Sequence, residues 1–246
     1  MVIEKRNGIC GIDAMTLRWL AMVLMLLDHI WLTLLKPDCI WLTYLGRVAF
    51  PIFAFQIAEG CAHTSNFKRY ALRLGFFALL SEIPYNMLRT GMGGFFALQY
   101  QNVMFTLLIG LLTLRLLLWA KDKTLWHKLF SILVFAIAYQ VAVMLHSDYG
   151  GIGVTVVVMF GLTNPLRRSR LIQLICLTLL MAARVTDTGS WGNPYQMFAV
   201  LAMGPIFLYN GTAGSKNKIL QYGAYLFYPA HISVLVILRY LAVKYG

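Results

Sequence analysis

Charged side chains are scarce in this sequence. Only 12% of its 246 residues are Asp, Glu, Lys or Arg, whereas ordinary soluble domains carry roughly 25%. So few charged side chains cannot cover the surface of a soluble core of this length. The shortage of charge therefore excludes an ordinary soluble enzyme.

Disorder is excluded by what the sequence has in excess. Hydrophobic residues make up 60% of the chain, aromatic residues 14%, and the mean hydropathy is +0.71. A disordered chain has the opposite composition, because it cannot bury enough apolar surface to fold. The remaining class is an all-α, polytopic membrane protein, since about 20 apolar residues form one spanning helix.

The sequence also lacks the motifs of several common site types. Its four cysteines have no metal-ligand spacing, and no Walker, H-E-x-x-H or G-x-S-x-G motif occurs. The net charge of +12 comes from short basic clusters between apolar runs. Nucleic-acid binding requires a basic face, so we expect contact with membrane lipid, no nucleic acid and no metal.

Apolar segments follow one another along the whole chain without a long linker, which predicts a single domain over residues 1–246. About nine transmembrane helices are predicted. They fall at 15–35, 42–61, 70–88, 100–120, 128–146, 150–164, 170–186, 195–210 and 218–240. The segment at 150–164 is short and rich in glycine, so it could be tilted, broken or re-entrant.

Basic residues in the connecting segments predict the orientation. If the N-terminus is cytoplasmic, most Lys and Arg face the cytoplasm, as the positive-inside rule requires. These residues are Lys5, Arg6, Lys68, Arg69, Arg73, Lys121, Lys123, Lys128, Arg167, Arg168, Arg170, Lys216 and Lys218. The bias predicts an N-in, C-out chain with an odd number of spans.

Several polar side chains lie inside the predicted spans, where a charge costs on the order of 2.5–3.5 kcal/mol. They share one level in the outer half of the bilayer, and they come from five spans. The set comprises Asp28, His29, Arg47, Glu82, Gln99, Asn102, Thr106 and His231. A layer with two histidines and two acids at one depth favours a functional site over simple helix–helix contacts.

The sequence alone does not determine which of these polar side chains interact with one another. Arg47 could pair with Glu82 or with Asp28, as a structural salt bridge or as part of a site. His29 is the strongest candidate base, because a neutral imidazole accepts a proton near pH 7. His231 could instead bond to a backbone carbonyl freed by Pro229.

A possible route from the cytoplasm follows from helix geometry. Arg18 and His29 are eleven residues apart and share a helix face, roughly 16 Å apart along the axis. Such a pair suits a long substrate that is anionic at one end. The basic cluster Lys68, Arg69 and Arg73 could also bind phosphates, although both groups could simply anchor the topology.

The order of several short motifs resembles the TraX family. The matching stretches run over nearly the whole chain: TLRWLA at 16–21, LDHI at 27–30, LGRVAFPIFAF at 45–55, IAEG at 57–60, SEIP at 81–84, NVMFT at 102–106 and YPAH at 228–231. The resemblance implies a bacterial inner-membrane protein linked to N-acetylation of conjugative pilin. The first motif also resembles membrane acyltransferases that O-acetylate sugars.

By this resemblance, acetyl-CoA is the cytoplasmic donor, His29 is catalytic and Arg18 helps to bind the donor. His29 would act as general base on the acceptor, with transient attachment of the acetyl group to His29 as the alternative. The expected function is acetyl transfer to a pilin N-terminus, a small amine or a glycan. Further expected roles are oxyanion stabilisation by Arg47, Asn102 or His231, orientation of the base by Asp28 or Glu82, donor binding by Lys68, Arg69 and Arg73, and substrate contacts by Asn102, Thr106 and Tyr228. The alternative is a proton-coupled transporter, but the internal repeats common in transporters are not evident in the sequence.

Overall fold

The computed structural model describes residues 11–90, 100–164, 169–187, 194–215 and 217–245. Within these ranges every regular element is a helix, and the only β-type pairings are isolated bridges. The predicted all-α class is therefore confirmed. Some of the basic residues used to predict the orientation lie outside the described residues, namely Lys5, Arg6, Arg167, Arg168 and Lys216. So does Gln99 of the predicted polar layer.

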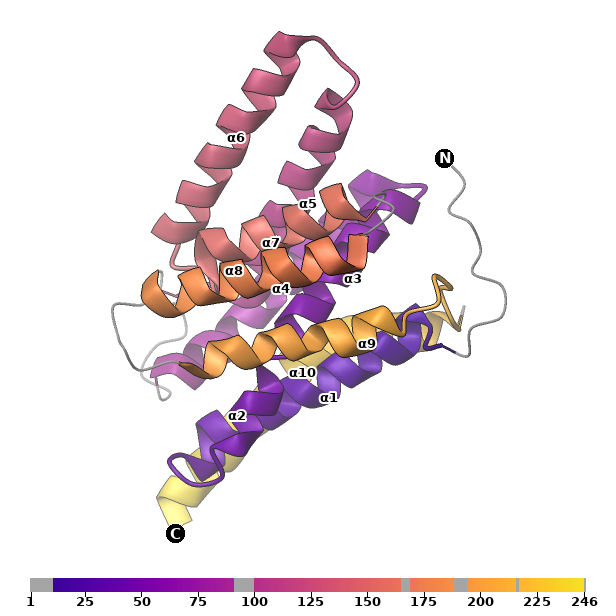
Figure 1. The fold of residues 1–246 in the computed structure, drawn as a ribbon. Helices are drawn as coiled ribbons and strands as arrows, with labels where there is room; N and C mark the ends of the chain where they lie inside the picture. The colour runs from indigo at the N-terminus through magenta and orange to yellow at the C-terminus, as the bar shows by residue number, and fades with distance from the viewer. Residues whose placement is uncertain (1–10, 91–99, 165–168, 188–193, 216, 246) are drawn as a thin grey trace.

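Every predicted apolar segment corresponds to one helix or to two consecutive helices (Figure 1). The elements are α1 (Ala14–Ile30), η1 (Trp31–Leu35), α2 (Trp41–Gly46), α3 (Ala49–His63), α4 (Phe67–Thr90), α5 (Val103–Ala120), α6 (Leu125–Met144), α7 (Gly150–Thr163), α8 (Ser169–Asp187), η2 (Pro194–Ala202), α9 (Met203–Phe207) and α10 (Lys218–Tyr245). Element η1 is a π-helix and η2 a 3₁₀-helix. The glycine-rich segment forms an uninterrupted helix, α7.

Five helical stretches are long and apolar enough to cross a membrane. They are Ala14–Leu35, Trp41–His63, Val103–Ala120, Leu125–Met144 and Tyr222–Tyr245. Two further apolar stretches, Gly150–Thr163 and Pro194–Phe207, are shorter. The structure therefore supports a multi-helix membrane protein, while the count of nine spans stays a prediction.

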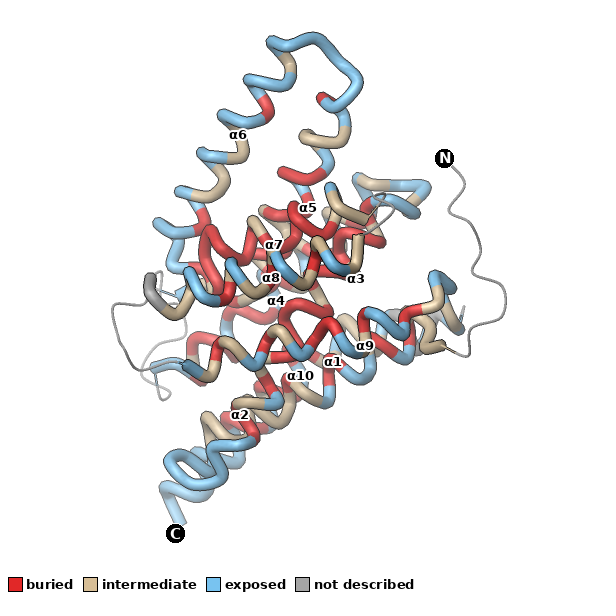
Figure 2. The backbone as a smooth tube through the Cα atoms, in the orientation of Figure 1, coloured by how far each residue is buried: buried red, intermediate tan, exposed pale blue. Residues whose placement is uncertain are grey.

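Helix α7 lies at the centre of the bundle and packs against α3, α5, α6 and α8. Its residues are largely buried, as are those of α3 (Figure 2). Glycines permit the close contacts: a Cβ on Gly110 would lie 2.8 Å from Val157, and one on Gly161 would lie 2.4 Å from Leu114. Helices α5 and α6 form a hairpin that projects from this core (Figure 1).

Backbone contacts join helix ends at two places in the bundle. At one end, Ile12 pairs with Tyr209, so the start of α1 adjoins the end of α9. At the other end, Gln101 exchanges hydrogen bonds with the turn between α6 and α7, through the carbonyl of His146 and the amide of Asp148. These two sets of backbone contacts hold together the ends of elements that are far apart in sequence.

Candidate active site

Two histidines from opposite ends of the chain meet inside the bundle. His29, in the last turn of α1, and His231, in α10, lie with Nδ1 of the first 2.7 Å from Nε2 of the second. Nδ1 of His231 lies 2.6 Å from the carbonyl oxygen of Phe227. The structure thus brings together two residues that sequence reasoning had placed only at a common depth.

The partner of His231 determines where the protons of the neutral pair lie. A carbonyl can only accept a hydrogen bond, so Nδ1 of His231 donates to Phe227 and Nε2 of His231 is unprotonated. That Nε2 accepts from Nδ1–H of His29. Nε2 of His29 then carries a free lone pair, and no other described residue bonds to this ring. The ring that sequence reasoning assigned as base therefore keeps its basic nitrogen available.

Asp28 hydrogen-bonds to Arg47 and Thr43 and not to the neighbouring His29. Its carboxylate accepts from the Arg47 Nη2 at 2.5 Å and from the Thr43 hydroxyl at 2.5 Å. Arg47 lies in the turn between α2 and α3, which allows its side chain to reach back to α1. The open choice between Glu82 and Asp28 as partner of Arg47 is thus resolved in favour of Asp28, and Asp28 does not hydrogen-bond to His29.

Gly46 is required for this approach of α2 to α1. A Cβ built at Gly46 would lie 2.2 Å from the Cβ of Asp28, which is closer than real side chains come. The glycine in the LGR motif therefore has a packing reason, because any side chain there would displace the carboxylate that holds Arg47.

Glu82, Asn102 and Thr106 form contacts away from the histidine pair. Asn102 caps α5 by accepting from the Met104 amide, and its side-chain amide donates to Glu82 at 2.6 Å. Thr106 hydrogen-bonds to Ser147 and to the backbone carbonyl of Asp148. These buried side chains fasten α4, α5 and the α6–α7 turn to one another. The structure does not bring Glu82 to His29 or leave the Asn102 amide free for an oxyanion.

A small chamber of about 110 Å³ adjoins the histidine pair at His29. Asp28, His29 and Arg47 line one part of it, together with Asp148 and Arg89. The remaining lining combines small or aliphatic residues and Met25 with five aromatic residues: Phe50, Phe53, Tyr85, Tyr149 and Tyr228. Arg47 also has an Nε that is buried without a hydrogen-bond partner among the described residues. We call this space the histidine chamber.

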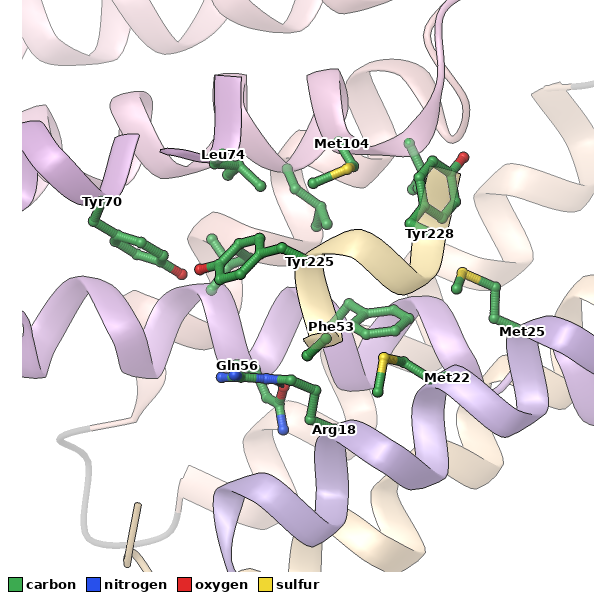
Figure 3. Close-up of a pocket in the computed structure, with 14 residues that line it drawn as sticks. Arg18, Met22, Met25, Phe53, Gln56, Tyr70, Leu74, Met104, Tyr225 and Tyr228 are labelled. Carbon is green, nitrogen blue, oxygen red and sulfur yellow. Dashed lines mark hydrogen bonds between the residues drawn. The ribbon is translucent and has the colours of Figure 1, made fainter. Parts of the chain in front are cut away.

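An apolar passage of about 100 Å³ shares walls with the histidine chamber. Met25, Phe53, Val103 and Tyr228 line both spaces. Figure 3 shows Met25 and Tyr228 toward one end of this passage and the side chains of Arg18, Gln56 and Tyr70 toward the other. A slender, mostly apolar group that entered at Arg18 would therefore be led toward His29.

The third space, the mouth cavity, is wider at about 430 Å³, and it shares Arg18, Gln56, Tyr70 and Tyr225 with the passage. The Arg18 Nε donates to Gln56 at 3.3 Å. Arg73 also lines the mouth, with its guanidinium 4.8 Å from the centre of the Tyr225 ring. Its Nε is buried without a partner in the described part of the chain. Two arginines thus make this mouth suitable for an anion.

Lys68 and Arg69 do not line the mouth cavity. Together with Arg73 they border a separate groove on the outer side of α4. The predicted cluster of three basic residues is therefore divided, because consecutive residues of a helix point in different directions. Only Arg73 belongs to both spaces.

The mouth cavity contains one acidic residue that sequence reasoning did not assign. Glu59, near the end of α3, accepts from the side-chain amide of Asn164 and lies within 3.4 Å of the Tyr209 hydroxyl. It also lies 3.5 Å from Nε2 of His63. Its place in the IAEG motif was visible, but its partners lie on distant segments. No group of three or more described His, Cys, Asp or Glu residues could hold a metal.

Comparison with known proteins agrees with this arrangement of motifs. The family model described as "TraX protein" matches residues 13–239. The chain belongs to the TraX family. A relative from Dichelobacter nodosus, "Probable fimbrial assembly protein FimC, serogroup H1", is 29% identical over 239 residues, covering 91% of this chain and 94% of the relative. No solved structure matches this TraX chain.

Proposed function

We propose that this TraX protein is a membrane acetyltransferase that uses cytoplasmic acetyl-CoA, with His29 as general base. The observation that carries the proposal is that Nδ1 of His29 donates to His231, which leaves Nε2 of His29 free. His29 lines a chamber that connects to a basic mouth through an apolar passage. A base needs a free lone pair at a position that both substrates can reach.

The three spaces match the parts of an acyl-CoA thioester. Phosphates fit the mouth cavity, where Arg18 and Arg73 supply charge-assisted hydrogen bonds. The slender arm fits the apolar passage, and the thioester fits the histidine chamber. Lys68 and Arg69 face the outer groove, so we assign donor binding to Arg18 and Arg73.

The proton transfers of this step need only one protein side chain, His29, which lines the chamber. The acceptor N–H or O–H loses its proton to Nε2 of His29 as its heteroatom forms a bond to the thioester carbonyl carbon. The C–S bond then breaks, and the proton on His29 passes to the departing sulfur, which leaves as the free thiol. His231 holds the ring of His29 in orientation while Nε2 gains and returns the proton.

Arg47 is the group that we assign to the developing oxyanion. Its Nη2 is committed to Asp28, whereas its buried Nε has no hydrogen-bond partner among the described residues. Asn102 uses its amide on Glu82 and Ala78, and His231 uses both ring nitrogens. Preorganised donors of this kind are often worth about 10²–10³ in turnover.

The orientation that we propose is N-in and C-out, with nine spans in a bacterial inner membrane. The contacts between helix ends support alternating spans. The start of α1 adjoins the end of α9, and Glu59 near the end of α3 contacts Asn164 at the end of α7. Alternation from a cytoplasmic start places all four of these positions on the cytoplasmic side, where Arg18 and Arg73 also lie.

The acceptor that we favour is the N-terminus of a pilin subunit, with a small amine or a glycan as the other candidates. The name of the Dichelobacter nodosus relative, which refers to fimbrial assembly, supports this choice. Purified protein incubated with labelled acetyl-CoA and these acceptors should transfer the label to at least one of them. Absence of both CoA binding and label transfer, with proton flux in proteoliposomes, would favour the transporter instead.

A further inference from the structure

A groove on the outer side of α4 shares Arg73 with the mouth cavity, but its other lining residues take no part in the proposed transfer. It borders α4 and the start of α10, has a volume of about 580 Å³ and is separate from the mouth cavity. Asn66, Lys68, Arg69, Leu72, Arg73, Phe76, Phe77 and Tyr222 line it. The groove therefore combines a basic end with an apolar and aromatic floor.

The two kinds of side chain occupy successive turns of one helix. Lys68 and Arg69 lie in the first turn of α4, while Leu72 and Phe76 follow at spacings of one helical turn. Leu72 is 63% exposed and Phe76 is 62% exposed, so both face the surroundings of the bundle. In a membrane those surroundings are lipid chains, which makes the basic end a neighbour of the head-group layer.

The charges of Lys68 and Arg69 are not neutralised by an acidic residue in the part of the chain that the structure describes. Neither Lys68 nor Arg69 forms an ion pair with any residue that the structure describes, and both side chains are exposed. The ring of Tyr225 contacts both Arg73 and Phe77, with its centre 4.8 Å from the guanidinium carbon and 5.3 Å from the centre of the Phe77 ring. These contacts hold two of the groove's lining side chains, Arg73 and Phe77, against α10.

We propose that this groove binds one anionic phospholipid. The phosphate lies between Lys68 and Arg69, and an acyl chain lies along Leu72, Phe76 and Tyr222. Basic pockets at the ends of membrane helices bind anionic head groups in this way. The complementarity of both charge and polarity favours a lipid over a free phosphate, because a free phosphate gains nothing from the apolar floor. This inference does not depend on acetyl transfer.

The test measures phosphatidylglycerol retained by the purified protein in native mass spectrometry after release from nanodiscs of phosphatidylcholine and phosphatidylglycerol in equal parts. We expect the Lys68→Gln, Arg69→Gln double variant to bind phosphatidylglycerol about 30-fold more weakly. The matched control is Lys121→Gln, Lys123→Gln, which removes the same charge from the exposed turn between α5 and α6. That control should retain the lipid like the wild type.

Two further arms separate the possible occupants of the groove. Phe76→Ala should weaken long-chain phosphatidylglycerol more than a short-chain form, whereas inorganic phosphate should fail to displace either lipid. Equal lipid retention by the Lys68/Arg69 variant and the wild type would overturn the proposal. So would displacement of the lipid by CoA, because the cluster would then belong to the donor site. Thermal unfolding in detergent checks that every variant is folded.

Discussion

The ion pair between Asp28 and Arg47 makes a quantitative prediction. Both side chains are largely buried, with relative exposures of 16% and 21%, and their charged atoms are 2.5 Å apart. Removing one partner from a buried pair costs about 3–5 kcal/mol, because the other charge is left uncompensated. Because both side chains keep some exposure to solvent, we expect a cost at the lower end of this energy range. We therefore expect Asp28→Asn to reduce the free energy of unfolding by about 3 kcal/mol.

A double-mutant cycle isolates the pair from other effects of each substitution. Arg47→Gln should cost a similar amount, whereas Asp28→Asn, Arg47→Gln together should cost much less than the sum of the two. Unfolding in mixed micelles, followed by loss of helicity, measures each variant. Asp38→Asn is the control, since Asp38 is exposed in the turn before α2. A coupling energy below about 0.5 kcal/mol would refute the conclusion that this pair stabilises the approach of α2 to α1.

Three further predictions concern packing, donor binding and topology. Gly46→Ala should destabilise the protein by about 1–3 kcal/mol, because its Cβ would meet Asp28, and unchanged unfolding would disprove that contact. Arg18→Ala should raise the Kd for CoA in isothermal titration at least tenfold, whereas Arg69→Ala should leave it unchanged. Equal effects of the two would reject the division of the basic cluster. An impermeant thiol reagent should label the exposed Cys39 in intact cells, and failure to label a folded protein there would contradict the N-in orientation.

The depth of each polar side chain within its predicted span could be derived from the sequence. The limits of each apolar run and the fixed rise per residue of a helix determine that depth. His29 and His231 were placed at one level on this basis, and the structure shows them in contact. The break that puts Arg47 in a turn between α2 and α3 was not predicted. The segment 42–61 is mostly apolar, and Arg47 was placed inside a continuous span because a polar side chain can also lie within a membrane helix.

The direction in which a side chain points was much less predictable than its depth. Glu82 lies at the expected level, yet its partner is Asn102, because the rotation of α4 in the bundle depends on packing against α5 and α10. Similarly, Lys68 and Arg73 are close in sequence and both line the groove outside α4, but only Arg73 also lines the mouth cavity. Glu59 was missed because its contacts come from α7 and the segment after α9.

Turnover of the His29→Gln variant tests the central claim most directly. The account predicts that folded His29→Gln protein binds CoA like the wild type but transfers acetyl groups about 10²- to 10⁴-fold more slowly, because the base acts in the transition state. His231→Ala should show a smaller loss, since it orients the ring of His29 and does not take the proton. Labelled acetyl-CoA and a responsive acceptor supply the assay. Near-normal acetyl transfer by folded His29→Gln protein would contradict the role of His29 as the base.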